Sequence, residues 1–334
     1  MKAFIRATGS YVPTRILSNH DLAKEMDTSD EWIFTHTGIH NRRIADPSEA
    51  ASDLAFKAAE ACLAACNADG GPQVAVTDID LILVATATPD FPGFPATAAI
   101  VQHKLGAINA GAMDVAAACT GFIYALETAR CFVSAGSARN VMVIGSEVFS
   151  RIVNWKDRTT CVLFGDGAGA VLVCANEHPD HGEILKSYLR ADGSGAGYLM
   201  REAGGSRKPF LSGTTPEAEQ YVSMNGRQVY IFAVGAIIET VNKMLEVAGL
   251  SIEDIDHIVP HQANRRILEA ACARAGWPQS KFHMNMDEYA NTSAASIPIA
   301  LDELYRAGRL HRGERILTVG FGAGLTYGGN IFYW

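Results

Sequence analysis

Long hydrophobic runs are absent from this 334-residue sequence. The longest uncharged apolar stretch, residues 229–238, is about half of the roughly 20 residues that cross a bilayer, so it predicts a buried helix. Charges at Lys2, Arg6 and Arg15 interrupt the start of the chain before any apolar block of signal-peptide length. We therefore expect a cytoplasmic protein that makes no membrane contact.

Basic residues are also in short supply. Lys and Arg number 28 against 36 Asp and Glu, which gives a net charge of −8. The basic runs are as short as Arg42-Arg43 and Arg265-Arg266. A nucleic-acid partner is therefore not expected.

The seven cysteines lack the spacing of a metal site or a disulfide framework. Their number is odd, they contain no CxxC pair, and they are scattered through apolar segments, which indicates a reducing compartment. Cys62 and Cys66 are four residues apart on an alanine-rich helical pattern, but no His or carboxylate completes a ligand set, so core packing is the better interpretation. No metal or resident cofactor is expected.

The sequence is rich in glycine and apolar residues, and it contains an internal repeat. A content of 48% hydrophobic residues and 31 glycines fits a well-packed globular protein rather than a disordered or fibrous one. The segment "DIDLILVATAT" at Asp78 corresponds to "DIDHIVPHQAN" at Asp254, an offset of 176. The strand patterns "VMVIG" at Val141 and "ILTVG" at Ile316 are 175 apart. The shared spacing indicates two copies of one architecture.

Each copy alternates strand and helix patterns, with Val, Ile and Leu runs typical of strands covered on both faces. We predict an α/β fold with layers in the order α/β/α/β/α. Residues 1–176 and 177–334 would form its two halves, related by a pseudo-twofold axis within one unit. Residues 192–215 are turn-rich enough for a long loop, and we expect this loop to cap the entrance to a site.

Cys119 is the first candidate catalytic residue. It follows the apolar strand pattern at "MDV" and precedes an apolar helical pattern, in "VAAACTGFIYAL". Unpaired N–H groups and the positive end of a helix dipole would favour its thiolate, and its own N–H could donate to an oxyanion. A buried structural cysteine is the alternative that this motif alone does not exclude.

His261 and Asn291 are expected to join Cys119. His261 directly follows a predicted strand, where ligand sites of such sheets gather, although a lone histidine is more often structural. Asn291, in "YANTSAAS", begins a helix equivalent to the one after Cys119. Its carboxamide can only donate or accept hydrogen bonds, and a helix N-cap is the alternative. The symmetry of the repeat favours convergence of all three residues.

Several motifs together resemble the β-ketoacyl-acyl-carrier-protein synthase III family of the thiolase superfamily. They are "DTSDEWI", "DVAAACTGF", "DRTTCVLFGDGAGAV", "VPHQAN", "ANTSAAS", in which Ala290 replaces the family's glycine, and "GFGAGLTYGG". The likeness runs essentially from end to end, with the motifs in the family's order. It implies a thiolase-like fold and a Cys-His-Asn condensing enzyme that uses no metal.

The resemblance implies two half-reactions. Cys119 takes the acyl group from a short acyl-CoA, and the carbanion formed by decarboxylation of malonyl-acyl carrier protein then attacks the acyl-Cys. His261 Nε2–H and the Asn291 amide would stabilise the enolate. The backbone N–H groups of Cys119 and Ala323 would hold the oxyanion of acyl transfer. The expected outcome is initiation of fatty acid synthesis.

The family likeness also assigns substrate contacts. Trp32 and Arg158 would grip the CoA adenine, as a tryptophan and an arginine are suited to do, with Gly226 and Asn264 along the pantetheine tunnel. Helix packing for Trp32 and a surface ion pair for Arg158 are the alternatives. The family usually has arginine where this chain has His36, and His40 also departs from its pattern. Because histidine is mostly neutral at pH 7, affinity for the CoA phosphates is open.

Two contacts with partner proteins follow from the same likeness. Arg265 and Arg266 would dock the acidic acyl carrier protein, and solvated surface charge is the alternative. Phe94 would cross the interface of a homodimer to close the partner's acyl pocket, which Leu325 would help to form. Packing of Phe94 within its own loop is the alternative.

Related functions would require different residues at the candidate site. A degradative thiolase would need a second cysteine near the C-terminal glycine turn, and the last cysteine is Cys272. Elongating synthases use a second histidine where Asn291 stands, and a non-catalytic acyl-carrier-binding partner would be expected to lack the nucleophile. A specialised relative that primes a secondary-metabolite or cofactor pathway remains an alternative.

The segment "GDGAGA", residues 165–170, matches a weak dinucleotide-binding pattern. The following "VLVCA" predicts a strand rather than the helix that such a fingerprint requires. The glycines are better explained by close backbone packing.

Overall fold

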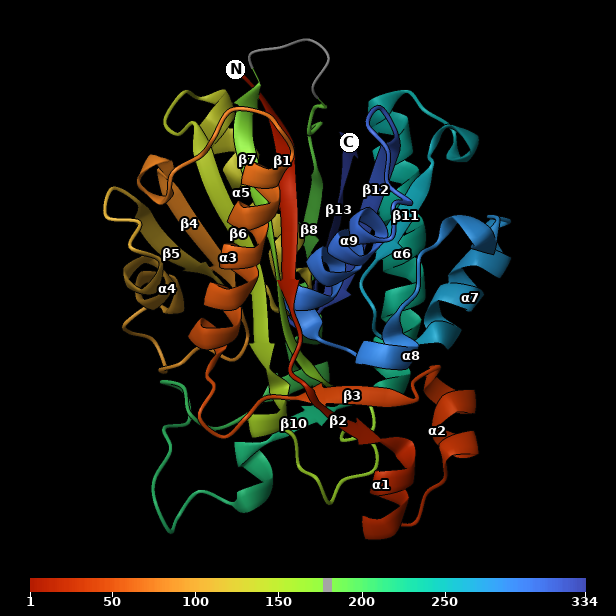
Figure 1. The fold of residues 1–334 in the computed structure, drawn as a ribbon. Coiled ribbons are helices and arrows are strands. Elements are labelled where there is room, and N and C mark those ends of the chain that lie inside the picture. The colour runs from red at the N-terminus through yellow and green to blue at the C-terminus, as the bar shows by residue number, and fades with distance from the viewer. Residues whose placement is uncertain (177–181) are drawn as a thin grey trace.

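Two β-sheets alternate with three layers of helices in the computed structural model, which describes residues 1–176 and 182–334 (Figure 1). The layers follow the predicted order α/β/α/β/α, so the expected fold class is confirmed.

The first sheet has five strands with α3 (Ala51–Ala68) and α4 (Thr97–Leu105) on its outer face. β4 (Leu81–Ala85) runs parallel to both of its neighbours, and β7 (Asp166–Asn176) runs antiparallel to both of its own. β7 begins one residue into the glycine-rich segment and contains all of the following "VLVCA", which confirms the case against a dinucleotide fingerprint. In spatial order the strands are β5 (Gly111–Val115), β4 (Leu81–Ala85), β6 (Asn140–Val148), β7 (Asp166–Asn176) and β1 (Lys2–Tyr11).

The second sheet repeats this pattern with α6 (Gly226–Ala248) and α7 (Arg265–Ala275) outside it. Residues 229–238 lie within α6, as predicted, although Tyr230 and Ile231 are exposed. Within the described ranges, no helix combines the length and the apolar character needed to cross a membrane. The strands in order are β11 (His257–Pro260), β12 (Arg315–Gly322), β13 (Thr326–Tyr333) and β8 (Tyr188–Ala191).

Two helices, α5 (Gly121–Ser134) and α9 (Ser296–Arg306), form the central layer. Their side chains share one hydrophobic core with strands of both sheets, which is why both helices are buried on opposite faces. The central layer therefore joins the two halves into one unit.

Strand register shows the repeat directly. Leu81 pairs with Val141 across β4 and β6, and His257 pairs with Ile316 across β11 and β12, which reproduces the offsets of 176 and 175. The predicted boundary between residues 176 and 177 adjoins residues 177–181, which lie outside the described residues. That boundary stays a prediction.

The two halves exchange loops across the central layer. The 3-10 turn at Ala294 packs on β6, where a Cβ atom on Gly145 would lie 2.2 Å from the Ala294 carbonyl oxygen. The equivalent turn at Cys119 packs on β12, where a Cβ atom on Gly320 would lie 3.8 Å from the Cys119 carbonyl oxygen. The missing side chains let each half's loop reach the other half's sheet.

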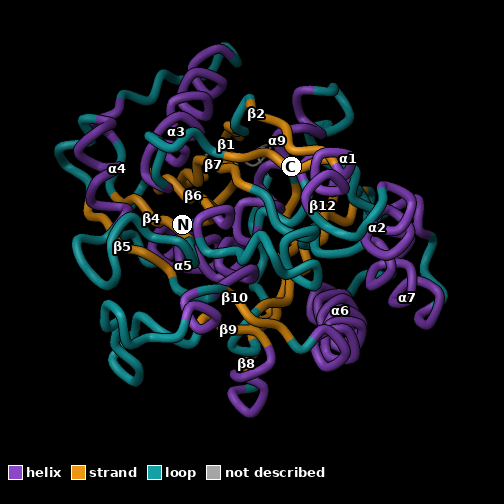
Figure 2. Tube along the Cα trace, turned by 90° about the horizontal axis from the view of Figure 1, so that it is seen from below, coloured by secondary structure: helices purple, strands orange, loops and turns teal. Residues whose placement is uncertain are grey.

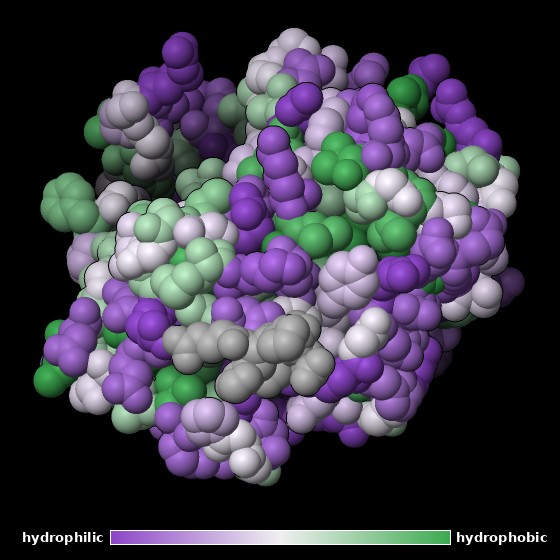
Figure 3. Space-filling model, turned by 90° about the horizontal axis from the view of Figure 1, so that it is seen from above, coloured by the Kyte–Doolittle hydropathy of each residue, from purple (hydrophilic) through white to green (hydrophobic). Residues whose placement is uncertain are grey.

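A smaller layer covers one end of the body, as the views in Figures 1 and 2 show. The opposite end, seen in Figure 3, carries mostly hydrophilic side chains around smaller groups of hydrophobic ones. The covering elements are β2 (Arg15–Ser18), α1 (Asn19–Glu25), α2 (Asp30–Thr37), β3 (Asn41–Ile44), β9 (Leu199–Arg201), β10 (Val222–Met224) and α8 (Met286–Tyr289).

The predicted capping loop, residues 192–215, has two parts. Its first part reaches the cavity described below through Leu199, and Asp192 exchanges backbone hydrogen bonds of 2.8 and 3.0 Å with Leu325. Its later part, with Phe210, instead lies beside Pro89 and the β6 end of the first sheet. Among the described residues, this later part therefore does not line that cavity, and Phe210 lines a separate hollow together with residues of the first half.

Candidate active site

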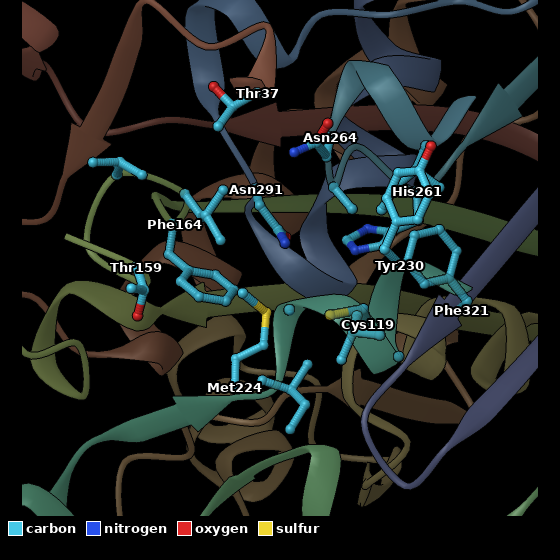
Figure 4. A pocket seen from close by; sticks show the side chains of 18 of the residues that line it. Thr37, Cys119, Thr159, Phe164, Met224, Tyr230, His261, Asn264, Asn291 and Phe321 are labelled. Atoms are coloured by element: carbon cyan, nitrogen blue, oxygen red, sulfur yellow. The ribbon is translucent and has the colours of Figure 1, made fainter. Parts of the chain in front are cut away.

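Cys119, His261 and Asn291 line one cavity of about 220 Å³ (Figure 4). Cys119 lies in the 3-10 turn before α5, His261 directly follows β11, and Asn291 precedes the turn that leads into α9. The His261 ring and the Asn291 amide nitrogen point into the same space beside the Cys119 sulfur (Figure 4). The structure thus brings together three residues from distant parts of the chain.

Strained backbone surrounds these residues. Among the described residues, the non-glycine positions with positive φ are Ala118, Ala290 and Ser293, at 46°, 58° and 49°. Each lies within two residues of Cys119 or Asn291, and such conformations cost about 1–3 kcal/mol apiece. Ala290 has ψ −156°, a combination that glycine adopts readily, and the family has glycine at that position.

His261 is a neutral imidazole. It is 1% exposed, its ring meets Phe321 edge-on at 5.4 Å, and burial lowers its pKa to about 3. Its Nδ1 lies 2.8 Å from Ser296 Oγ, whose single hydrogen is donated to Ser293 O at 2.9 Å. This arrangement assigns the ring hydrogen to Nδ1 and leaves the Nε2 lone pair for the cavity.

Asn291 is oriented by its own loop. Its side-chain oxygen accepts a 2.8 Å hydrogen bond from the Ser293 N–H, and its backbone bonds to Leu163 and Gly165 at 2.9 and 3.0 Å. The side-chain NH₂ is therefore left to face the cavity, as Figure 4 shows. The capping alternative also holds in part, because Asn291 does bind a backbone N–H near the start of α9.

Cys119 is less acidic than the helix start suggested. It is 4% exposed, and burial raises its pKa to about 12. The expected thiolate-favouring environment is therefore wrong for the resting protein, because desolvation of the charge outweighs the helix N-terminus.

The turn after β12 is tied to the cysteine loop. Thr326 Oγ1 donates to Ala117 O or Ala323 O, each at 3.1 Å, and lies 3.1 Å from Thr120 Oγ1. Ala323 is thereby held next to the loop of Cys119, although it does not itself line the cavity among the described residues.

The predicted CoA-binding residues lie along the same cavity. Trp32, Arg158, Gly226 and Asn264 all line it, as does Leu325. The Arg158 guanidinium stands 4.7 Å over the Trp32 ring and donates to Asp27 O at 2.6 Å, so this pair is closed. Asn264 also caps α7 and donates to His36 O at 3.0 Å.

The remaining predicted residues lie outside the cavity. Arg266 is exposed at the start of α7, and Arg265 stacks over the Phe34 ring at 4.8 Å. Phe94 is 87% exposed on the loop before α4. Within the described chain, Phe94 therefore does not pack within its own loop, which was the alternative.

His36 and His40 are both held by α2. His36 stacks on Trp32 at 4.4 Å, with Nδ1 2.6 Å from Trp32 O. His40 stacks on Phe34 and lies 2.9 Å from Asp30, whose pKa it lowers. The His36 ring thus packs against Trp32, and the contacts above do not involve its Nε2 atom.

Sequence reasoning missed Ser296, Thr326 and Glu147. The first two orient the site through the hydrogen bonds above, and Glu147 is a fully buried carboxyl at the end of β6. Ser296 stands within the quoted "NTSAAS" motif, but no pattern in the sequence shows that its hydroxyl meets His261.

Comparisons with known proteins agree from end to end. The family described as 3-oxoacyl-[acyl-carrier-protein] synthase III matches residues 113–193, and its C-terminal family matches residues 245–334. A β-ketoacyl-[acyl-carrier-protein] synthase III of Caldanaerobacter subterraneus is 52% identical, covering 99% of this chain and 98% of that protein. One from Clostridium acetobutylicum is 48% identical over the same shares.

Solved structures give the same result. The synthase III of Aquifex aeolicus has a TM-score of 0.89 and 42% identity, covering 99% of this chain and 100% of that chain. The priming β-ketosynthase of the R1128 polyketide pathway has a TM-score of 0.89 and 34% identity, covering 99% and 96%.

The fold and its relatives define a condensing acyltransferase with a thiolase-like fold. The chain belongs to the β-ketoacyl-[acyl-carrier-protein] synthase III family.

Proposed function

We propose that the protein condenses a short acyl-CoA, most simply acetyl-CoA, with malonyl-acyl carrier protein and thereby initiates fatty acid synthesis. The observation that carries this proposal is that Cys119, His261 and Asn291 line one cavity together with Trp32 and Arg158. The reaction uses the CoA thioester as substrate and requires no metal. We expect it to take place in the cytoplasm.

Acylation begins at the Cys119 sulfur. The sulfur attacks the thioester carbonyl, CoA departs, and the acyl group remains on Cys119. The backbone N–H groups of Cys119 and Ala323 hold the oxyanion, and the tie from Thr326 to both loops supports this role for Ala323.

Condensation uses His261 and Asn291. Loss of CO₂ from the malonyl thioester places negative charge on its carbonyl oxygen, which two donors can stabilise. Asn291 offers its NH₂ directly. His261 becomes the second donor when Ser296 turns its hydrogen toward Nδ1, since the ring hydrogen then resides on Nε2.

CoA binding requires a local opening. A planar base between Trp32 and Arg158 needs more room than the 4.7 Å now separating them. Arg158 must therefore give up its hydrogen bond to Asp27 O when adenine enters.

We place carrier-protein docking at the start of α7. Arg266 is exposed there, whereas Arg265 is partly engaged by Phe34 and Gly38. Arg266→Glu should weaken turnover with the acidic carrier protein while acylation by acyl-CoA is retained. Equal losses in both reactions would reject docking at this residue.

We also propose a homodimer through the open edge of the first sheet. β5 pairs with one strand only, and Phe91, Phe94, Ile108 and Met113 expose apolar side chains around it. Phe94 would then reach the partner's acyl pocket near Leu325. Sedimentation should show a dimer, and a monomer at working concentrations would contradict the interface.

Mass spectrometry tests the reaction as a whole. Labelled acetyl-CoA should leave an acetyl adduct on the Cys119 peptide, and malonyl-acyl carrier protein should convert it to a 3-oxoacyl product. Cys119→Ser should form neither. Absence of an adduct with every short acyl-CoA would reject the primer assignment.

A second candidate, priming of a specialised pathway, is favoured by one observation. The polyketide priming synthase shares the fold and 34% identity over nearly the whole chain. Competition between acetyl, branched and longer acyl-CoAs distinguishes the two, since preference for an unusual primer would favour the specialised role.

A further inference from the structure

Glu147 is a buried carboxyl that the reaction outlined above does not use. It is 0% exposed and ends β6 near the cysteine loop. It accepts hydrogen bonds from Thr88 Oγ1 at 2.6 Å and from the Ala87 N–H at 3.1 Å. Among the described residues no Lys, Arg or His forms an ion pair with it, so burial raises its pKa to about 7. Burying a carboxylate without a cationic partner is costly.

Ser293 lies between this carboxyl and the nucleophile. The 3-10 turn Ser293–Ala295 packs both on the turn Ala118–Thr120, which holds Cys119, and on β6, which holds Glu147. Ser293 is fully buried, yet its Oγ makes no well-formed hydrogen bond to any described residue. An unpaired buried hydroxyl in a strained backbone, at φ 49°, is free to donate and accept in turn.

The repeat shows that this carboxyl is not a feature of both halves. Glu147 lies 175 residues before Gly322, at the equivalent end of the equivalent strand. In the second half the glycine leaves room for the Cys119 backbone. In the first half the same position carries a carboxyl, on the strand against which the Ser293 turn packs.

The thiol proton needs an acceptor. The Cys119 pKa is raised to about 12, while that of His261 is lowered to about 3. A carboxylate whose pKa is raised to about 7 is a far stronger base than that imidazole. Glu147 is also partly ionised at neutral pH.

We propose that Glu147, through the hydroxyl of Ser293, takes the Cys119 proton during acylation and returns it during condensation. This proposal rests on the proposed function. In acylation the S–H bond breaks, the S–acyl bond forms, CoA leaves as the thiolate and is protonated by solvent. The Cys119 proton passes to Ser293 while the Ser293 proton passes to Glu147. In condensation CO₂ leaves, the new C–C bond displaces the Cys119 thiolate, and the stored proton returns by the same route.

The surroundings of Glu147 supply few other titratable groups. Cys119 faces it across Ser293, and the β4 end contributes the hydroxyls of Thr86 and Thr88. The next carboxylates along the packed elements are bound separately. Asp90 accepts from Ser52 of α3, and Asp166 of β7 accepts from Ser150 and Ala45.

The test is the pH dependence of Cys119 alkylation by iodoacetamide, read on the Cys119 peptide by mass spectrometry. The full-length protein should show a rate that rises with an inflection near the Glu147 pKa, about 7. Glu147→Gln and Ser293→Ala should each remove that inflection and slow alkylation at pH 7 by at least tenfold. Asp166→Asn, a matched buried carboxyl held by a hydroxyl and N–H groups, should behave like the parent protein.

The direction of the change in alkylation rate distinguishes a proton acceptor from a carboxylate that acts only through its charge. A carboxylate acting only through its charge raises the thiol pKa, so Glu147→Gln would then speed alkylation. Faster or unchanged alkylation in a folded variant would overturn the proposal. If Glu147→Gln does not fold, Ser293→Ala decides in the same assay.

A second readout keeps this inference apart from the proposed function. Acyl transfer from acetyl-CoA to Cys119 should slow at least tenfold in Glu147→Gln and Ser293→Ala. Normal acylation in both variants would overturn the relay alone. Failure of the parent protein to acylate would instead overturn the proposed function, while the alkylation profile would still test the relay.

Discussion

The first half of the chain holds Cys119 one residue after Ala118, and the second half holds Ala294 one residue after Ser293, 175 residues further on in each case. Both leading residues have nearly the same positive φ, 46° and 49°. Both turns lead into a central helix and pack on the opposite sheet. The first loop carries the candidate nucleophile on the turn itself, whereas the second carries Asn291 three residues before its equivalent point. Duplication supplied two inward-facing strained loops, and different side chains then gave them different chemistry.

The largest expected effect separates the roles of the two loops. Cys119→Ala should abolish both half-reactions, because the acyl group has no acceptor. Asn291→Ala should slow decarboxylative condensation by about 10²–10³-fold while leaving acylation nearly unchanged, since one enolate donor is lost. Rapid-quench measurement of CoA release and of CO₂ release checks this. Equal losses in both steps for Asn291→Ala would show that the second loop also serves acylation.

A second prediction concerns the two glycines on which the loops rest. A Cβ on Gly145 would stand 2.2 Å from the Ala294 carbonyl oxygen, which is backbone and cannot turn aside. A Cβ on Gly320 would meet Ile123 Cδ1 at 2.8 Å, the movable end of a side chain. Gly145→Ala should therefore cost about 3 kcal/mol of folding free energy and Gly320→Ala about 1 kcal/mol. Denaturant unfolding compares them, and equal costs would deny the asymmetry.

A third prediction tests strain in the second half alone. Ala290 has φ 58° and ψ −156°, which glycine adopts without its Cβ penalty. After the extra chain entropy of glycine is subtracted, Ala290→Gly should raise the free energy of unfolding by about 1 kcal/mol. Ala295→Gly, at a buried position with φ −77°, should lower it. A loss of stability in both variants would contradict the strain at Ala290.

Much of the layered fold follows from the sequence because the repeat preserves strand register. The 175-residue spacing of "VMVIG" and "ILTVG" reappears as paired strands, and continuous apolar runs appear as buried strands. The thiol's acidity did not follow, since a helix start is visible in sequence but the burial that outweighs it is not. Turn residues in a sequence do not reveal which surface a loop contacts, so the sequence does not separate the part of residues 192–215 at the cavity from the part beside the first sheet.

The site residues divide in the same way. Cys119, His261 and Asn291 stand in motifs at strand and helix ends, so their meeting at one cavity could be expected. Glu147 and Ser296 bond to partners more than 30 residues away in sequence, and no sequence motif links either residue to its partner. Only packing shows that such a residue faces the nucleophile or the imidazole.

The smallest predicted effect lies where the two halves meet at the cavity. His36 of α2 accepts a hydrogen bond from Asn264 of the second half through its backbone oxygen, and its ring supports Trp32. Arginine there would add a permanent charge and more donors toward the CoA phosphates. One exposed contact of this kind is worth roughly 0.5–1 kcal/mol, so His36→Arg should lower KM for acyl-CoA about two- to fivefold with kcat unchanged. Thr35→Arg adds the same charge to an exposed neighbouring position of α2 and controls for general attraction. Equal gains in both variants would mean that net charge, rather than the position of His36 beside Trp32, governs the affinity.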